Sequence, residues 1–229
     1  MLSEAQVLEL FRRLQARAPK GRRAPIVKED ADAFRALVAC LLSAQSLDSN
    51  TDKAKRALFA LADTPEGILA LSDAAVARAI RPAGLYNVKT RNLKRLCRAL
   101  IEEHGKRVPR DRKGLMGLPG IGRKCADILL HFSFGEDTIA VDTHVHRVCN
   151  RTGLAEGRSE ADTAKSLEAR APDWALADGH LWLLEFGKKT CRSRAPKCPD
   201  CCLQDLCEAY AAVPPGVTPA PARSPAGSR

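Results

Sequence analysis

A lysine at the start of a predicted helix is the first residue in this chain that could do chemistry. The run Leu-Pro-Gly-Ile-Gly-Arg-Lys at 118–124 ends one helix at its proline and turns at its two glycines. The helix that follows would begin with unpaired backbone N–H groups, which attract a phosphate. Their positive field favours the neutral, nucleophilic form of Lys124. The alternative is that Arg123 and Lys124 simply touch phosphate.

A carboxylate occupies the same kind of position further along the chain. Asp142 stands where an N-cap would stand, ahead of an apolar pattern that starts at Val145. A capping aspartate accepts hydrogen bonds from backbone N–H groups and contributes ~1 kcal/mol to the helix. An ionised carboxylate at a helix start can also stabilise positive charge that develops in a reaction. From this position alone, the plain cap is the favoured interpretation.

Five of the nine cysteines crowd into residues 191–207, and four of them form the pattern C-x6-C-x2-C-x5-C. Four thiolates this close together indicate a metal centre, because the segment has no apolar core of its own. Zinc usually takes two C-x2-C pairs, and the uneven spacing here fits a [4Fe–4S] cluster better. Cys202 is surplus. The predicted ligands are Cys191, Cys198, Cys201 and Cys207, and the predicted core thiols are Cys40, Cys97, Cys125 and Cys149.

Positive charge surrounds the predicted metal centre. Arg192, Arg194 and Lys197 lie between the first two ligands, in a loop that Pro196 stiffens. Such a loop, held at both ends, is suited to phosphates, although a solvated basic loop is the simpler alternative. The formal net charge of the chain is +10, which favours a polyanionic partner or serves solubility alone.

Two histidines and two aromatic residues have simpler interpretations. His144 and His146 are two positions apart, so they point to different faces of a helix and would not share a metal. We predict structural support from both, or a backbone phosphate contact by His144. Trp182 and Phe186 lie four positions apart on a predicted helix and are expected in the core.

The elements that position these residues all follow a helical period. Of the 229 residues, 45% are hydrophobic, and no stretch alternates as a strand would. No apolar run could span a membrane, and the N-terminus does not resemble a signal peptide, so we expect a cytoplasmic protein, nucleoid-associated if bacterial. Residues 18–30 are expected as a linker. The predicted helices carry Val7 to Leu14, Phe34 to Leu42, Leu58 and Leu61, Val76 and Ile80, Leu93 to Ile101, Ile128 to Phe132, Val145 to Cys149, and Trp182 to Phe186, with another opened by Ser159 and Asp162.

Five motifs in order resemble the endonuclease III family of helix-hairpin-helix DNA glycosylases and AP lyases. They are Leu-Leu-Ser-Ala-Gln at 41–45, Gly-Leu-Tyr-Asn at 84–87, the hairpin at 118–124, Val-Asp-Thr-His at 141–144, and the cysteine pattern at 191–207. Together they cover most of residues 30–207, and five motifs in the correct order make the resemblance specific.

The resemblance implies an all-α fold of two helical domains with a DNA-binding groove between them. A six-helix barrel with the helix-hairpin-helix would occupy residues 26–136. A discontinuous domain at 1–25 and 137–212 would hold a [4Fe–4S] cluster on the four cysteines. The Pro-rich tail at 213–229 is expected to be disordered.

The resemblance also implies roles for individual residues. Lys124 and Asp142 match the catalytic lysine and aspartate of the family, and Gln45 and Leu85 match residues that fill the gap left by a flipped nucleotide. The partner would be double-stranded DNA with damaged bases or abasic sites, bound by a monomer without a membrane. The DNA-binding residues would further include Gly120, Ile121, Gly122, Arg123, His144, Arg192, Arg194 and Lys197.

The activity implied is a bifunctional one, in which oxidised pyrimidines are removed and the strand is cut 3′ of the abasic site through a Schiff base on Lys124. The alternatives are a glycosylase of the same fold for a mismatched thymine or a pyrimidine dimer, and a non-catalytic protein that binds damaged DNA. Adenine-specific relatives carry a glutamate where this chain has Ala44, and they are disfavoured. Cys125, His146, Leu181 and Glu185 also depart from the family pattern, which leaves lesion preference open.

Overall fold

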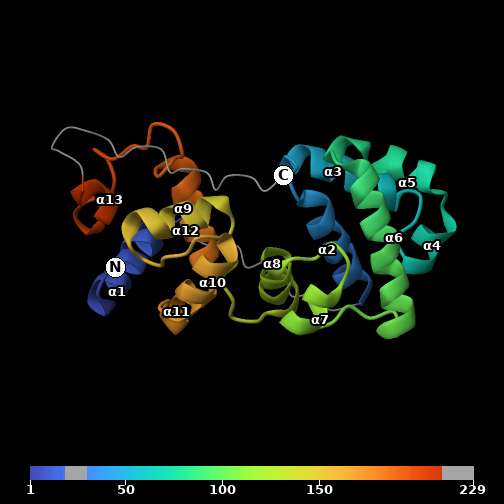
Figure 1. Cartoon of the computed structure of the whole chain (residues 1–229), viewed down its shortest axis with the longest axis horizontal. Coiled ribbons are helices and arrows are strands. Elements are labelled where there is room, and N and C mark those ends of the chain that lie inside the picture. The colour runs from blue at the N-terminus through green and yellow to red at the C-terminus, as the bar shows by residue number, and fades with distance from the viewer. Residues whose placement is uncertain (19–29, 213–229) are drawn as a thin grey trace. The chain divides into compact units, whose positions relative to one another are not determined.

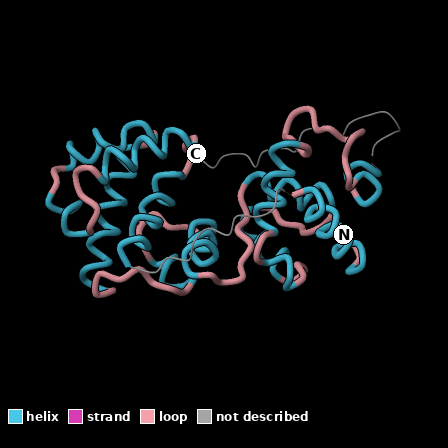
Figure 2. Tube along the Cα trace, turned by 180° about the vertical axis from the view of Figure 1, so that it is seen from behind, coloured by secondary structure: helices cyan, strands magenta, loops and turns pink. Residues whose placement is uncertain are grey.

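Helices and the loops between them make up all of the chain that the structure describes, residues 1–18 and 30–212 of a computed structural model (Figures 1 and 2). The all-α prediction is confirmed for these residues. The chain divides into two compact units, Met1–Arg23 with Asp137–Arg229 as unit 1 and Ala24–Glu136 as unit 2. No helix among the described residues is long and apolar enough to cross a membrane. The predicted disordered tail and most of the predicted linker lie outside the described residues.

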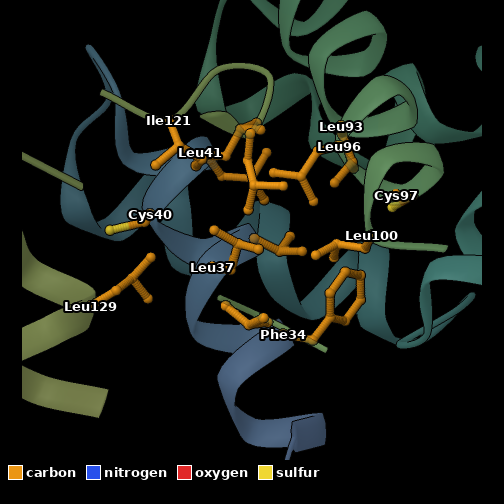
Figure 3. Packing of buried hydrophobic residues seen from close by; sticks show 14 of the residues in the cluster. Phe34, Leu37, Cys40, Leu41, Leu93, Leu96, Cys97, Leu100, Ile121 and Leu129 are labelled. Atoms are coloured by element: carbon orange, nitrogen blue, oxygen red, sulfur yellow. The ribbon is translucent and has the colours of Figure 1, made fainter. Parts of the chain in front are cut away.

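Unit 2 packs its helices around one apolar cluster (Figure 3). Residues with no exposed surface, such as Leu37 of α2 and Leu96 and Leu100 of α6, form its centre, and burying each stabilises the fold by roughly 1.5–3 kcal/mol. Helix α6 packs against α2, α4 and α5, while α8 packs against α2 and α7. Its elements are α2 (Asp30–Ser43), α3 (Asp48–Phe59), α4 (Pro65–Ala70), α5 (Asp73–Ile80), η1 (Arg81–Ala83), α6 (Tyr86–Glu103), α7 (Arg112–Gly117) and α8 (Arg123–Phe134).

Unit 1 has a separate core that brings the N-terminal helix together with the C-terminal segment. Helix α1 packs against α12, and α12 packs against α9. Trp182 and Phe186 are buried in this core, as predicted. Its elements are α1 (Glu4–Arg17), α9 (Thr143–Thr152), α10 (Glu160–Glu168), α11 (Asp173–Leu176), α12 (Gly179–Lys189), η2 (Gln204–Leu206) and α13 (Glu208–Ala211).

Local sequence signals explain where several of these helices begin. Ser3 and Gln6 form the predicted capping box of α1, in which each side chain bonds the backbone of the other residue. The Ser72 side chain caps α5 as expected. Ser159 and Asp162 form a second capping box at the start of α10. A side-chain oxygen at each of these positions satisfies backbone N–H groups that the helix leaves unpaired.

The cysteines expected in the core do not all lie in the same environment. Cys40, Cys97 and Cys149 are buried as predicted. Cys125 is half-buried and lies in the first turn of α8, packed against the edge of the apolar cluster. All nine cysteines are free thiols.

Candidate active site

The hairpin between α7 and α8 is fixed by a glycine that no other residue could replace without strain. Gly120 has a φ of +84°, in the left-handed region that favours glycine. A Cβ atom at this position would lie 3.1 Å from Cβ of Asn92 and 3.3 Å from Cδ1 of Leu41. The turn therefore presses its backbone against α6 and α2, and this contact holds the start of α8 in place.

A buried carboxylate joins the two helices of the hairpin. Asp127 of α8 has a side chain that is 1% exposed, and it accepts a 2.7 Å bond from Nε of Arg112 on α7. Nε of Arg123 lies 3.4 Å from its other oxygen. Arg123, predicted to contact DNA, thus pairs with Asp127 one turn further along α8.

Lys124 follows the hairpin as the second residue of α8, and it is exposed. Gly122 occupies the N-cap position, and no side chain caps the helix there. The first backbone N–H groups of α8 therefore have no helical partner and can meet an anion. The N–H group of Ile121, unlike those at the start of α8, already has a partner, because it donates to Leu118 O at 3.1 Å. The Ile121 side chain is buried.

Two residues predicted to enter the DNA have unusual backbone conformations. Gln45 has a φ of +52° and Leu85 a φ of +46°, although neither is glycine. A non-glycine residue in the left-handed region has a strained backbone, which persists only where the surrounding structure enforces it. Such residues are more frequent at functional sites than elsewhere. Leu85 is also 55% exposed, so its side chain is accessible from solvent. Both side chains are thus presented by constrained turns.

A buried lysine connects the two turns. Lys89 is 5% exposed, and its ammonium group donates to Leu42 O and to Ala83 O, each at 2.8 Å. The first carbonyl lies three residues before Gln45 and the second lies two before Leu85. Burial lowers the pKa of Lys89. Lys89 was not among the predicted site residues, and its signal in the sequence is a lysine on the otherwise apolar face of a helix.

Asp142 is the N-cap of α9 in unit 1, as predicted. Its Oδ1 accepts hydrogen bonds from the backbone N–H groups of His144 and Val145, both at 2.9 Å. Within the part of the chain that the structure describes, no group donates to Oδ2. Capping and a further role are therefore compatible, because each uses a different oxygen.

Two buried arginines of α9 hold the loop that carries the cysteines. Arg147 donates to Cys191 O at 2.9 Å and to Gly187 O at 2.8 Å. Arg151 donates to Arg192 O at 2.8 Å and to Ser193 O at 3.1 Å. The sequence analysis did not identify these arginines, although two cations four positions apart on one helix face were visible in the sequence.

The four predicted cysteine ligands line one cavity in unit 1. Two of their sulfurs already face N–H donors, since Arg151 donates to Cys191 Sγ at 3.6 Å and the Leu203 N–H to Cys201 Sγ at 3.4 Å. Such N–H···S bonds are typical of thiolates that hold iron–sulfur clusters. Burial raises the pKa of Cys201 to about 12, so metal must replace protons when it binds. Among the described residues no three His, Cys, Asp or Glu side chains are placed to hold a single metal ion.

The basic loop and the histidines lie close to these elements. Arg192, Arg194 and Lys197 are exposed, and none of them forms an ion pair among residues 1–18 and 30–212. His144 is half-buried and its Nδ1 lies 3.2 Å from Arg147, while His146 Nδ1 lies 2.8 Å from the Thr163 hydroxyl. Each histidine therefore has a structural contact inside unit 1.

Comparisons with known proteins agree with these observations. Residues 38–173 match the HhH-GPD superfamily base excision DNA repair protein family. The chain belongs to this superfamily. It is 40% identical to endonuclease III of Escherichia coli strain K12 over 90% of this chain and 97% of that protein. It is 43% identical to endonuclease III of Haemophilus influenzae over 76% of this chain and 83% of that protein.

Solved structures show the same relationship. A trapped covalent intermediate of endonuclease III with DNA matches with a TM-score of 0.83 at 34% identity, over 92% of this chain and 98% of that one. A thermostable thymine-DNA glycosylase matches with a TM-score of 0.73 at 26% identity, over 91% of this chain and 94% of that one. The resemblance predicted from the five motifs is thus confirmed.

Contacts within unit 2 bring three of the predicted features together. Lys89 joins the turns of Gln45 and Leu85. Gly120 of the hairpin packs on α2, which precedes the first turn, and on α6, which follows the second. Unit 1 similarly joins Asp142, the cysteines and the basic loop through the single helix α9.

Proposed function

We propose that this chain is a bifunctional DNA glycosylase and AP lyase of base excision repair, with Lys124 as its nucleophile. The observation that carries the proposal is the position of this exposed lysine, one residue past the N-terminus of an uncapped helix that follows a rigid hairpin. The unpaired backbone N–H groups that follow the hairpin would bind a phosphate of the DNA, and the sugar of the bound nucleotide would then lie close to the Lys124 amine.

The proposed reaction uses the free amine of Lys124. Its nitrogen attacks C1′ of the damaged nucleotide, the bond from C1′ to the base breaks, and the base leaves with a proton. The nitrogen lone pair then forms a C1′=N double bond as the C1′–O4′ bond breaks and O4′ takes a proton. This opens the sugar ring and leaves a protonated imine, which acidifies the neighbouring C2′ position. Loss of a C2′ proton allows β-elimination, which breaks the C3′–O bond and cuts the strand on the 3′ side.

Asp142 would stabilise the positive charge that builds up at the sugar as the base leaves. Its Oδ2 is the oxygen that capping does not use. We assign Asp142 this electrostatic role because the two capping bonds hold its carboxylate in one orientation before the reaction begins.

Gln45 and Leu85 are the residues that we propose fill the duplex where the damaged nucleotide is flipped out. Flipping costs a few kcal/mol of stacking and pairing, which inserted side chains offset in part. An exposed leucine and an amide, each on a constrained turn, suit this role because they need little further ordering on binding. Lys89 would position both.

The substrate that we propose is an oxidised pyrimidine in duplex DNA. Endonuclease III relatives match more closely than the thymine-DNA glycosylase, in TM-score and in identity. A mismatched thymine or a pyrimidine dimer would be the substrate of a glycosylase of the same fold. Since the proposed substrate is chromosomal DNA, we also propose that the protein works at the nucleoid if its source is bacterial.

The four cysteines would hold a [4Fe–4S] cluster, which when bound supplies a rigid cross-link for the segment from Cys191 to Cys207. Four thiols around one cavity, with N–H donors aimed at two sulfurs, fit such a group. The fixed loop would present Arg192, Arg194 and Lys197 to phosphates. Purified protein should be brown and contain iron and sulfide, whereas one equivalent of zinc without iron would contradict the assignment.

A panel of duplexes tests the function. Each carries one lesion, namely thymine glycol, a mismatched thymine, a pyrimidine dimer or an abasic site, and nicking is followed on a gel. We expect cleavage of the thymine glycol and abasic duplexes. Binding of the abasic duplex without nicking would identify a non-catalytic DNA-binding protein instead, and cleavage confined to the mismatch or dimer would change the substrate class.

A further inference from the structure

Two cysteines from distant parts of unit 2 face each other across α2 and α8. Cys40 of α2 and Cys125 of α8 are 85 positions apart in sequence. The Cys125 thiol donates to Cys40 O at 3.5 Å, and the Cys40 thiol lies 3.8 Å from Cys125 O. Figure 3 shows Cys40 at the edge of the apolar cluster, on the side where Ile121 and Leu129 lie. Each thiol is thus held against the backbone of the other residue.

The two thiols differ in the way that a reactive pair requires. Cys40 is buried, whereas Cys125 is half-buried and lies in the first turn of α8. A hydrogen bond from Cys40 lowers the pKa of Cys125, and the charge of Lys124 and the backbone of Gly122 lower it further. The same contact, together with burial, raises the pKa of Cys40. A partly exposed thiol at a helix start beside a lysine is the kind that reacts as a thiolate.

Two other thiols, Cys97 and Cys149, lack these features. Burial raises the pKa of Cys97 to about 12, and it also raises the pKa of Cys149. Both have no exposed surface. The remaining thiols belong to the cysteine segment of unit 1. Within unit 2, only Cys125 combines exposure with a second thiol in contact.

We propose that Cys40 and Cys125 form an oxidisable pair that a peroxide converts to a disulfide. The Cys125 thiolate attacks one oxygen of the peroxide, which breaks the O–O bond and leaves a sulfenic acid while water departs after protonation. The sulfur of the Cys40 thiol then attacks the Cys125 sulfur and forms the S–S bond, while the sulfenic hydroxyl leaves with the Cys40 proton as a second water. Two thiols and one hydrogen peroxide thus give one disulfide and two waters.

The disulfide would tie the last turn of α2 to the first turn of α8. Those turns lead to Gln45 and carry Lys124, respectively. The inference does not depend on the proposed function, because the modification can be measured without DNA.

The test exposes the cluster-loaded protein to limiting hydrogen peroxide, blocks the remaining thiols with an alkylating reagent, and maps peptides by mass spectrometry. We expect one linked peptide that contains Cys40 and Cys125, lighter than the two free peptides by two hydrogen atoms, and we expect dithiothreitol to release it. Cys97 and Cys149 should not be oxidised. Cys125 found as a sulfinic acid without a linked peptide, or both thiols still open to alkylation, would overturn the proposal.

Matched variants distinguish the thiol that reacts with peroxide, Cys125, from the thiol that then forms the disulfide, Cys40. In Cys40→Val, Cys125 should still be oxidised but should accumulate as a sulfenic acid that dimedone traps. In Cys125→Thr, Cys40 should stay reduced under the same exposure. Oxidation of Cys40 to the same extent without Cys125 would contradict the assigned order of reaction. Circular dichroism checks that each variant is folded, and the wild-type peptide map decides the matter if either is not.

Discussion

Replacing Lys89 with methionine tests how the two strained turns of unit 2 are positioned. Methionine keeps the length and apolar stem of the side chain and removes the ammonium group. The ammonium donates to Leu42 O and Ala83 O at 2.8 Å. Each of the two buried acceptors left without its donor costs about 1–3 kcal/mol, or roughly 2–6 kcal/mol together, and part of this is recovered because a buried charge is also removed. We expect Lys89→Met to lower the free energy of unfolding by about 2–4 kcal/mol.

The more specific effect of Lys89→Met is expected on the recognition of abasic-site DNA. Without Lys89, the turns that present Gln45 and Leu85 lose their common support. These residues would then become ordered only when DNA binds, and the loss of conformational entropy would weaken binding. We expect the preference for abasic over undamaged duplex to fall about tenfold, which corresponds to about 1.4 kcal/mol. The measurement is a binding titration with both duplexes, combined with urea unfolding of the same protein.

Lys94 provides a matched control on the same helix. Its ammonium donates to Leu69 O at 3.0 Å and also to Leu71 O, so it supports the end of α4 and not the two turns. Lys94→Met should therefore destabilise the protein while leaving the abasic preference unchanged. The reasoning fails if Lys89→Met remains folded and keeps its full preference, or if both variants lose it equally.

Three further outcomes follow from local features. Gly120→Ala should cost about 1–2 kcal/mol in thermal or urea unfolding and should weaken DNA binding, because alanine is strained at φ +84° and meets Asn92; unchanged stability would contradict the role given to this turn. A hydrogen bond from Ser159 lowers the pKa of Asp162 below 3.8, so its contribution to stability is present above that pH and is lost as pH falls through the lower folded value. In Asp162→Asn, the urea midpoint should therefore fall less than in wild type as the pH drops below 3.8. If the segment from Cys191 to Cys207 holds the proposed cluster, removal of the cluster by a chelator should make that segment more sensitive to protease, because Arg147, Arg151 and Arg13 then hold it with fewer cross-links; an unchanged digestion pattern would argue against a structural cluster.

Features that depend on neighbours in sequence could be predicted. The Ser3–Gln6 capping box, the Asp142 cap and the hairpin glycine each follow from two to four adjacent residues, whose hydrogen bonds and backbone angles are local. The cysteine spacing indicated that four side chains would lie together, and all four line one cavity. Their role as cluster ligands stays a prediction.

Features that depend on partners far along the chain could not be predicted. Lys89 is buried because two carbonyls from other elements receive its ammonium group, and neither is adjacent in sequence. Asp127 was not among the predicted site residues, yet its buried carboxylate joins α8 to Arg112 of α7. Cys125 was expected in the core, and its contact with Cys40 depends on how α8 packs against α2. Each of these side chains takes its role from tertiary packing, which hydrophobic periodicity does not describe.

Trapping with borohydride tests the central claim most directly. The protein is incubated with an abasic-site duplex and reduced during turnover, and the covalent product is digested and sequenced by mass spectrometry. We expect a single protein–DNA adduct at Lys124, and we expect Lys124→Ala to bind the duplex without forming it. An adduct at another residue, or equal trapping by Lys124→Ala, would contradict the mechanism.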